Sequence, residues 1–183
     1  MKDGASKAFE QCYNGQAVVD DKAQVIVAAD VTQQANDKRQ IEPMVSQMME
    51  NLGGAAPEAL TADAGYFSEE NVNLLDERRI DGYIAVGRQK HDPPPDASSS
   101  GEVQAGATAK DRMAAKLRTD QGRATYRMRK AIVEPVFGQI KSCRGLRRFL
   151  LRGLTKVRAE WRLICAGHNL LKLFVSGWAA KPA

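Results

Sequence analysis

The feature that most constrains the fold of this chain is an alternation of short apolar runs with segments of helical period. Residues 15–20 and 24–31 are rich in β-branched residues and are separated by a short polar connector, so they predict an antiparallel hairpin. Residues 32–53 follow with apolar side chains at helical spacing, and Gly53-Gly54 ends the segment. The apolar face of this predicted helix consists of Ile41, Met44, Val45, Met48 and Leu52.

A second pattern places one carboxylate at the end of a buried strand. The apolar run 59–62 ends on Asp63, and a glycine two residues later allows a tight turn. Ser68 is a suitable N-cap for a helix over residues 69–79, and residues 82–86 predict another strand. The order β-β-α-β-α-β predicts an α/β fold with strands of mixed direction and flanking helices. Strand ends are where such folds place reactive groups.

The composition of the chain changes after residue 87. Residues 88–108 are rich in proline, serine and glycine and predict a flexible surface loop within one domain of residues 1–183. Residues 109–175 predict a basic helical part. Its expected helices cover residues 109–119, 123–143 and 156–175, with a basic turn over 145–154. Pro135 lacks a backbone donor and predicts a kink or a helix start near Glu134.

Positive charge is concentrated in this second part of the chain. Residues 109–162 contain 16 Lys and Arg but four Asp and Glu, a balance of +12. The other residues carry 11 basic and 18 acidic groups, a balance of −7, so that the whole chain has a net charge of +5. A strongly basic segment predicts a polyanionic partner, and nucleic acid is the first choice. Solvated helix faces are the alternative explanation.

The composition argues against membrane and secreted proteins. No apolar run approaches the roughly 20 residues that cross a bilayer, and residues 1–14 are polar, unlike a signal peptide. The cysteines, Cys12, Cys143 and Cys165, match neither a disulfide framework nor a zinc pattern. We therefore expect a cytoplasmic protein with reduced thiols and no membrane contact.

Asp63 and Glu134 are the acids that we expect to meet in a metal site. Hard cations such as Mg²⁺ take oxygen ligands, usually one or two carboxylates with water and phosphate oxygens. On an ideal helix, Lys130 and Lys141 share the face of Glu134 and would favour a phosphodiester at the same place. Two metal ions about 4 Å apart would activate the attacking oxygen and stabilise the leaving one. Spacing alone does not distinguish these two acids from the others.

Four local patterns occur in a fixed order along the chain. They are YNGQAVVD at 13–20, ADVT at 29–32 followed by Asp37, TADAGY at 61–66, and Tyr126-x-x-Arg129 with EPVFG at 134–138 and Lys141. Together they span most of the chain and resemble the DDE transposases of bacterial insertion sequences. The segments around Asp63 and Glu134 are the more specific ones.

The resemblance implies a ribonuclease H-like fold and three carboxylates that bind two Mg²⁺ for DNA cleavage and strand transfer. Asp63 matches the second aspartate of that set, and Glu134 matches its glutamate. The family's signature tyrosine, arginine and lysine correspond to Tyr126, Arg129 and Lys141. Four residues separate Arg129 from Glu134, where some relatives have three, so Lys130 is a rival for the role of Arg129. The further candidates for phosphate contacts in the basic turn are Arg147 and Arg148.

The chain departs from the family pattern at the first aspartate. In the family this residue lies on a first strand that precedes those seen here, and nothing upstream of Tyr13 predicts such a strand. Asp20 and Asp30 match no catalytic position. We therefore expect the C-terminal part of a transposase catalytic domain, lacking its first strand and inactive in strand transfer alone, so that enzyme activity is left open.

The resemblance also implies partners and a location. The partners would be insertion-sequence ends and target DNA, with the missing N-terminal part or further copies of the chain. The location would be the bacterial cytoplasm, in association with the nucleoid. Two alternatives remain: a non-catalytic DNA-binding remnant, whose affinity comes from the basic region through counterion release, and a ribonuclease H-like nuclease.

Overall fold

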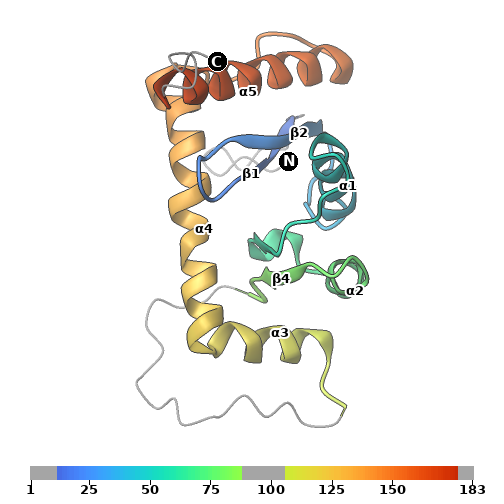
Figure 1. Ribbon diagram of the computed structural model, residues 1–183. Coiled ribbons are helices and arrows are strands. Elements are labelled where there is room, and N and C mark those ends of the chain that lie inside the picture. The colour runs from blue at the N-terminus through green and yellow to red at the C-terminus, as the bar shows by residue number, and fades with distance from the viewer. Residues whose placement is uncertain (1–11, 88–105, 177–183) are drawn as a thin grey trace. The chain divides into compact units, whose positions relative to one another are not determined.

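Figure 1 shows the computed structural model, which describes residues 12–87 and 106–176. Most of the loop predicted over residues 88–108 lies outside the described residues. The described chain forms two compact units. Unit 1 contains residues 12–35, 43–54 and 130–176, and unit 2 contains residues 36–42, 55–87 and 106–129. The assignment of one domain to the whole chain stays a prediction.

Unit 1 begins with the hairpin that the sequence predicted. β1 (Asn14–Val19) pairs with β2 (Ile26–Thr32) in antiparallel orientation. In the connector, the carboxylate of Asp20 accepts a hydrogen bond from the backbone N–H of Ala23 at 2.7 Å. Gln24 adopts a left-handed conformation with a φ of 56°. The polar connector thus closes the turn with a side-chain hydrogen bond of its own.

Helix α1 (Ile41–Asn51) supplies side-chain partners to the backbone of β2. Gln47 accepts a hydrogen bond from the N–H of Ala29 at 3.0 Å, and Asn51 donates one to the carbonyl of Val27 at 2.8 Å. These two amides bind the N–H of Ala29 and the carbonyl of Val27, which could otherwise form hydrogen bonds with another strand. They therefore protect this edge of the hairpin against unwanted pairing.

Helix α1 is shorter than the helix predicted over residues 32–53. Residues 33–40 have no apolar period, and the helix begins at Ile41, the first apolar position of the predicted face. Ile41, Met44, Val45 and Met48 are buried as expected. Leu52 is 46% exposed because it lies beyond the last residue of the helix, so its assignment to the buried face was wrong.

Helix α4 (Asp120–Gly138) runs through Pro135 and continues into the π-helix η2 (Gln139–Cys143). Proline lacks the N–H that would bond to the carbonyl of Ala131, one turn earlier. The side chain of Gln24 fills this gap, because its Nε2 donates to that carbonyl at 2.9 Å. The helix therefore begins well before the proline. Of the two alternatives expected here, a kink or a helix start, the helix start is wrong.

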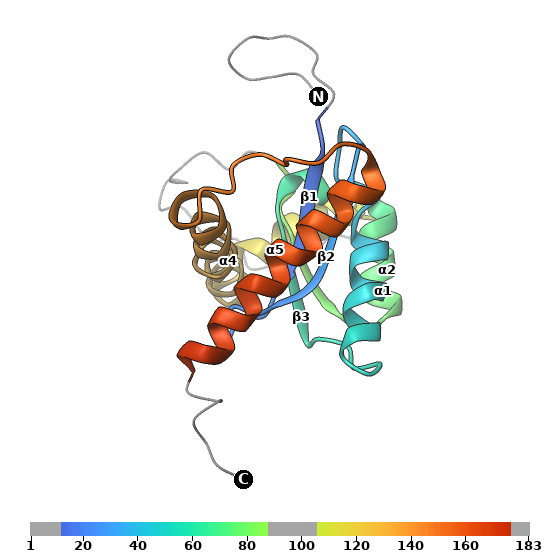
Figure 2. The same cartoon turned by 90° about the horizontal axis from the view of Figure 1, so that it is seen from above.

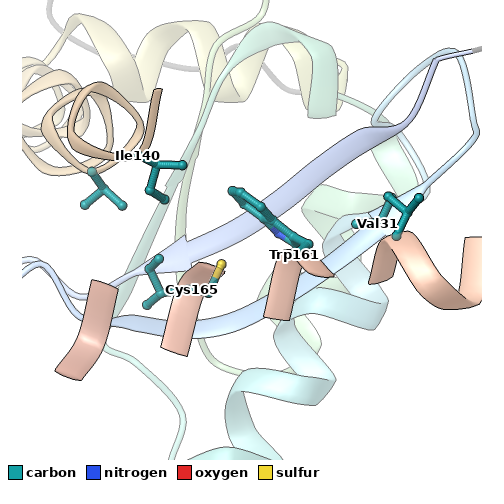
Figure 3. Close-up of a cluster of buried hydrophobic side chains, with 7 residues drawn as sticks. Val31, Ile140, Trp161 and Cys165 are labelled. Atoms are coloured by element: carbon teal, nitrogen blue, oxygen red, sulfur yellow. The ribbon is translucent and has the colours of Figure 1, made fainter. Parts of the chain in front are cut away.

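Helix α5 (Leu154–Val175) lies across the hairpin (Figures 1 and 2). The buried side chains between them and α4 form the core of unit 1 (Figure 3): Ile26, Val31, Val136, Ile140, Val157, Trp161 and Cys165. Trp161 donates a hydrogen bond to the carbonyl of Gln16 at 2.8 Å, and Asn169 bonds both backbone groups of Ile26 at 2.8 Å. These polar contacts fix the direction in which α5 crosses the strands.

Unit 2 contains a parallel pair of strands joined by a helix. β3 (Ala59–Ala62) pairs with β4 (Asp81–Ile84), and α2 (Glu69–Glu77) makes the crossover that parallel strands require. The N-cap of α2 is Ser68, whose hydroxyl accepts a hydrogen bond from the N–H of Asn71 at 3.2 Å. The cap predicted from the sequence is confirmed.

Helix α3 (Ala109–Arg118) is fastened to β4 through Lys116. Its ammonium forms an ion pair with Asp81, donates to the carbonyl of Gly82 at 2.8 Å and lies 4.3 Å from the centroid of the Tyr83 ring. The hydroxyl of Tyr83 donates to Asp81 at 2.7 Å. Partial burial would raise the pKa of Asp81, but the hydrogen bonds from Lys116 and Tyr83 outweigh it and lower that pKa.

Strands and helices occur in both units, so the α/β class is confirmed. The four described strands form two hydrogen-bonded pairs and not one hydrogen-bonded mixed sheet. The ribonuclease H-like arrangement therefore stays a prediction. Over residues 12–87 and 106–176, no helix combines the length and the apolar character needed to span a membrane.

Candidate functional site

Asp63 stands directly after β3, at the strand end where the sequence predicted it. It is the N-cap of the short 3-10 helix η1 (Ala64–Tyr66), and its Oδ1 accepts a hydrogen bond from the N–H of Gly65 at 2.9 Å. The side chain is exposed to solvent. This hydrogen bond orients the carboxylate, and its second oxygen faces no hydrogen-bond donor in the described chain.

Asp37 brings a second carboxylate to the same turn. A Cβ built on Gly65 would lie 3.1 Å from Oδ1 of Asp63 and 3.2 Å from Oδ2 of Asp37, so the two oxygens flank one small space. Any larger residue at this position would press on both carboxylates. Asp37 occurs in one of the family-like patterns, but the sequence suggested no role for it, and its place beside Asp63 is a finding of the structure.

A buried amide holds the two segments of this site together. Asn71 of α2 is 5% exposed, and its Nδ2 donates to the carbonyls of Lys38 and Tyr66 at 2.7 and 2.6 Å. The first carbonyl follows Asp37 directly, and the second ends η1, so one side chain spans both segments. We call Asp37 together with residues 63–66 the acidic turn.

Glu134, the other predicted metal ligand, lies on the part of α4 that belongs to unit 1. Its side chain is exposed and has no ion pair or hydrogen bond within the described residues, although Lys130 is one turn away on the same helix. Lys141 belongs to η2, where its ammonium lies 5.3 Å from the centroid of the Phe137 ring. Because a π-helical turn holds more residues than an α-helical one, Lys141 is rotated from the position expected on an ideal helix.

Tyr126 and Arg129 lie on the part of α4 that belongs to unit 2. The guanidinium carbon of Arg129 is 5.6 Å from the centroid of the Tyr126 ring, within the range of a cation–π contact. The Nε of Arg129 is buried and has no hydrogen-bond partner among the described residues. Lys130 is exposed, so it is the more accessible of the two rival cations.

Arg147 and Arg148 belong to the segment between η2 and α5. We call residues 144–153 the arginine loop. Both side chains are exposed, and neither has an acidic partner within the described residues. The carboxylate of Glu160, on the first turns of α5, accepts hydrogen bonds from two backbone N–H groups of the loop. The sequence analysis counted Glu160 as one of four acids in the basic segment and missed this contact.

The structure brings Asp63 together with Asp37, whereas Glu134 lies in the other unit. The convergence of Asp63 and Glu134 therefore stays a prediction. Within the described part of the chain, no three His, Cys, Asp or Glu side chains gather closely enough to hold a metal ion. The acidic turn supplies two carboxylates in one place, which is the number that Mg²⁺ commonly takes from a protein.

Comparison with known proteins gives one match. Residues 99–174 match the family model described as a transposase DDE domain. No curated protein and no solved structure matches the chain. The matched segment contains Glu134, the residues of its signature and the arginine loop. The resemblance to DDE transposases that was found in the sequence motifs is thus confirmed.

Proposed function

Residues 99–174 match a transposase DDE domain, and on this premise we propose that the chain takes part in DNA transposition. The reaction class is the metal-dependent cleavage and joining of DNA strands. The proposed substrates are the ends of a bacterial insertion sequence and its target DNA. The proposed place of action is the cytoplasm, at the nucleoid, and the proposed fold is ribonuclease H-like.

The state of Glu134 carries this proposal. It is one of four acids among 16 basic residues between 109 and 162, yet its exposed carboxylate has no ion pair within the described residues. Its carboxylate is not engaged by Lys130, one turn away on the same helix, and is therefore open to a ligand from solvent. Its availability fits a role as a metal ligand.

Asp63 and Glu134 carry carboxylates, which are the ligand type that a hard divalent cation takes. We propose that Asp63 and Glu134 bind Mg²⁺, with Asp37 beside Asp63 and water or phosphate oxygens completing the coordination. When bound, the metal lowers the pKa of the attacking water and stabilises charge on the scissile phosphate. The chain's own contribution is to orient Asp63 through the N–H of Gly65.

Exposed cations of the basic segment are the proposed contacts to DNA. Lys130, Lys141, Arg147 and Arg148 are exposed, and Lys and Arg side chains at such positions bind phosphate oxygens. Tyr126 and Arg129 contact one another, and we propose that they too bind DNA phosphate groups. The affinity of this surface for DNA would fall with increasing salt.

The test measures DNA binding with and without metal. The full chain is titrated into fluorescently labelled double-stranded DNA in EDTA or in MgCl₂. We expect Mg²⁺ to strengthen binding by the wild-type protein, and we expect Asp63→Asn and Glu134→Gln to abolish this gain. Asp21→Asn and Glu50→Gln remove the same charge at exposed positions outside the site and are expected to keep it.

The same titration tests the first alternative, and a cleavage assay tests the second. Salt-dependent DNA binding that is indifferent to Mg²⁺ and survives Glu134→Gln would favour a non-catalytic DNA-binding module. Cleavage of the RNA strand of an RNA–DNA hybrid would favour a ribonuclease H-like nuclease.

A further inference from the structure

The arginine loop is held in place by apolar contacts and by hydrogen bonds to its backbone. Two of its apolar members, Leu146 and Phe149, pack against the core of unit 1. The Phe149 ring makes edge-to-face contacts with Tyr13 and Trp161, with centroids 6.2 and 6.1 Å apart. The loop therefore has a hydrophobic anchor in its middle.

Backbone hydrogen bonds fix the second half of the loop. Glu160 accepts from the N–H of Leu150 through Oε1 at 2.8 Å and from the N–H of Leu151 through Oε2 at 2.9 Å. The hydroxyl of Tyr13 accepts from the N–H of Gly153 at 2.9 Å. The single carboxylate of Glu160 is thus occupied by the loop backbone and not by a neighbouring guanidinium.

The groups that the loop turns outward are suited to a nucleic acid. Arg147 and Arg148 are exposed, and Leu150 is 71% exposed despite the two hydrogen bonds that fix its neighbourhood. The loop leads into the N-terminus of α5, where Gly153 has no side chain to cap the first N–H groups. Such N–H groups and the helix dipole favour phosphate. Apolar side chains between cations are a known means of contacting a DNA groove.

We propose that the arginine loop is a preformed binding element for double-stranded DNA, with Glu160 as its positioning residue. Arg147 and Arg148 bind backbone phosphates, and Leu150 packs against sugars and base edges in the minor groove. This proposal rests on the proposed function, because it names the surface with which the same protein holds DNA. It predicts that an acidic residue is required for binding to an acidic ligand.

The test uses the fact that charge and loop position predict opposite effects of the same substitution on DNA affinity. Glu160→Gln removes a negative charge beside the loop, so electrostatics alone would make DNA binding tighter. Glutamine, however, has one acceptor oxygen and places an NH₂ group against a backbone N–H, so the loop loses a hydrogen bond. We expect the affinity of the full chain for a short DNA duplex to fall by about threefold to tenfold, because binding must then order the loop.

Control variants distinguish the effect of the lost charge from the effect of a displaced loop. Glu50→Gln makes the same charge change on α1 in the same unit and is expected to bind as tightly as the wild type. Arg147→Gln and Arg148→Gln are each expected to reduce the slope of log affinity against log salt by about one. Leu150→Ala is expected to weaken binding without changing that slope, whereas Leu170→Ala, at an exposed leucine of α5, is expected to change neither.

The outcomes are decisive in each direction. If Glu160→Gln binds DNA as tightly as Glu50→Gln with an unchanged salt slope, the positioning role is overturned while the proposed function stands. If the wild-type chain shows no salt-dependent DNA binding, both fall. If the Glu160→Gln variant does not fold, hydrogen exchange of the wild-type protein tests the proposal instead. Exchange of the Leu150 and Leu151 amides at unprotected rates would refute a preformed loop.

Discussion

The acidic turn and the arginine loop present opposite charges but are built in a similar way. Two carboxylates lie at the first, and a neutral amide on the following helix, Asn71, binds its backbone. Exposed guanidinium groups lie on the second, and a carboxylate on the following helix, Glu160, binds its backbone. In both cases a side chain of the following helix holds the backbone of a charged segment. The difference is that substitution of Asn71 is a purely structural change, whereas substitution of Glu160 is also electrostatic.

The largest expected effect comes from breaking the support of the acidic turn. Asn71→Ala removes the side-chain donor to the partly buried carbonyls of Lys38 and Tyr66, so we expect the free energy of unfolding to fall by about 1–3 kcal/mol. Urea denaturation followed by circular dichroism measures it. Asn73→Ala on the same helix, at an exposed position, is expected to change it by less than about 0.5 kcal/mol. Equal losses in the two variants would contradict the role given to Asn71.

Glycine-to-alanine substitutions are expected to change the free energy of unfolding by less, and to lower it at one position and raise it at another. Gly65→Ala places a Cβ against Asp63 and Asp37 and should lower the free energy of unfolding by about 1–2 kcal/mol. Gly138→Ala adds a methyl group in helix α4, where nothing lies within 4 Å, and should raise it by about 0.5–1 kcal/mol. The same denaturation curves measure both, and a stabilising Gly65→Ala would show that the two carboxylates do not crowd this turn.

The smallest expected effect is a change in the rate at which a thiol next to the arginine loop is modified. Cys143 is exposed immediately before the loop, whereas burial raises the pKa of the Cys165 thiol to about 12. Because the thiolate is the reactive form, Cys165 should not react with a chromogenic thiol reagent at pH 8 until the protein unfolds. Cys143 should react rapidly, and DNA bound to the loop should slow this reaction.

The control for this probe is Cys143→Ser, which should remove the phase that DNA protects and leave any reaction of Cys12. Protection of Cys143 by DNA in the Glu160→Gln variant, equal to that in the wild type, would argue against the loop as the contact.

Local patterns in the sequence predicted most elements of this protein. The hairpin, the strand before Asp63, the Ser68 cap and the long last helix follow from periodicity and capping, which depend on neighbouring residues. The same reasoning overestimated α1, because polar residues 33–40 were joined to a helix whose apolar face begins at Ile41. It also allowed a helix start at Pro135, because the side chain that donates to the Ala131 carbonyl, Gln24, is distant in sequence.

Only the tertiary structure decided the surroundings of the candidate residues. Asp37 reaches Asp63 across 26 positions of sequence, Asn71 bridges their two segments, and Glu160 bonds a loop about ten residues before it. No residue spacing encodes these contacts, since they arise when separate elements bury their apolar faces and bring distant backbone groups within hydrogen-bonding distance. The sequence therefore determined which residues carry charge and which segments are helix or strand, and the packing of those segments determined which charges are held, shielded or left open to a partner.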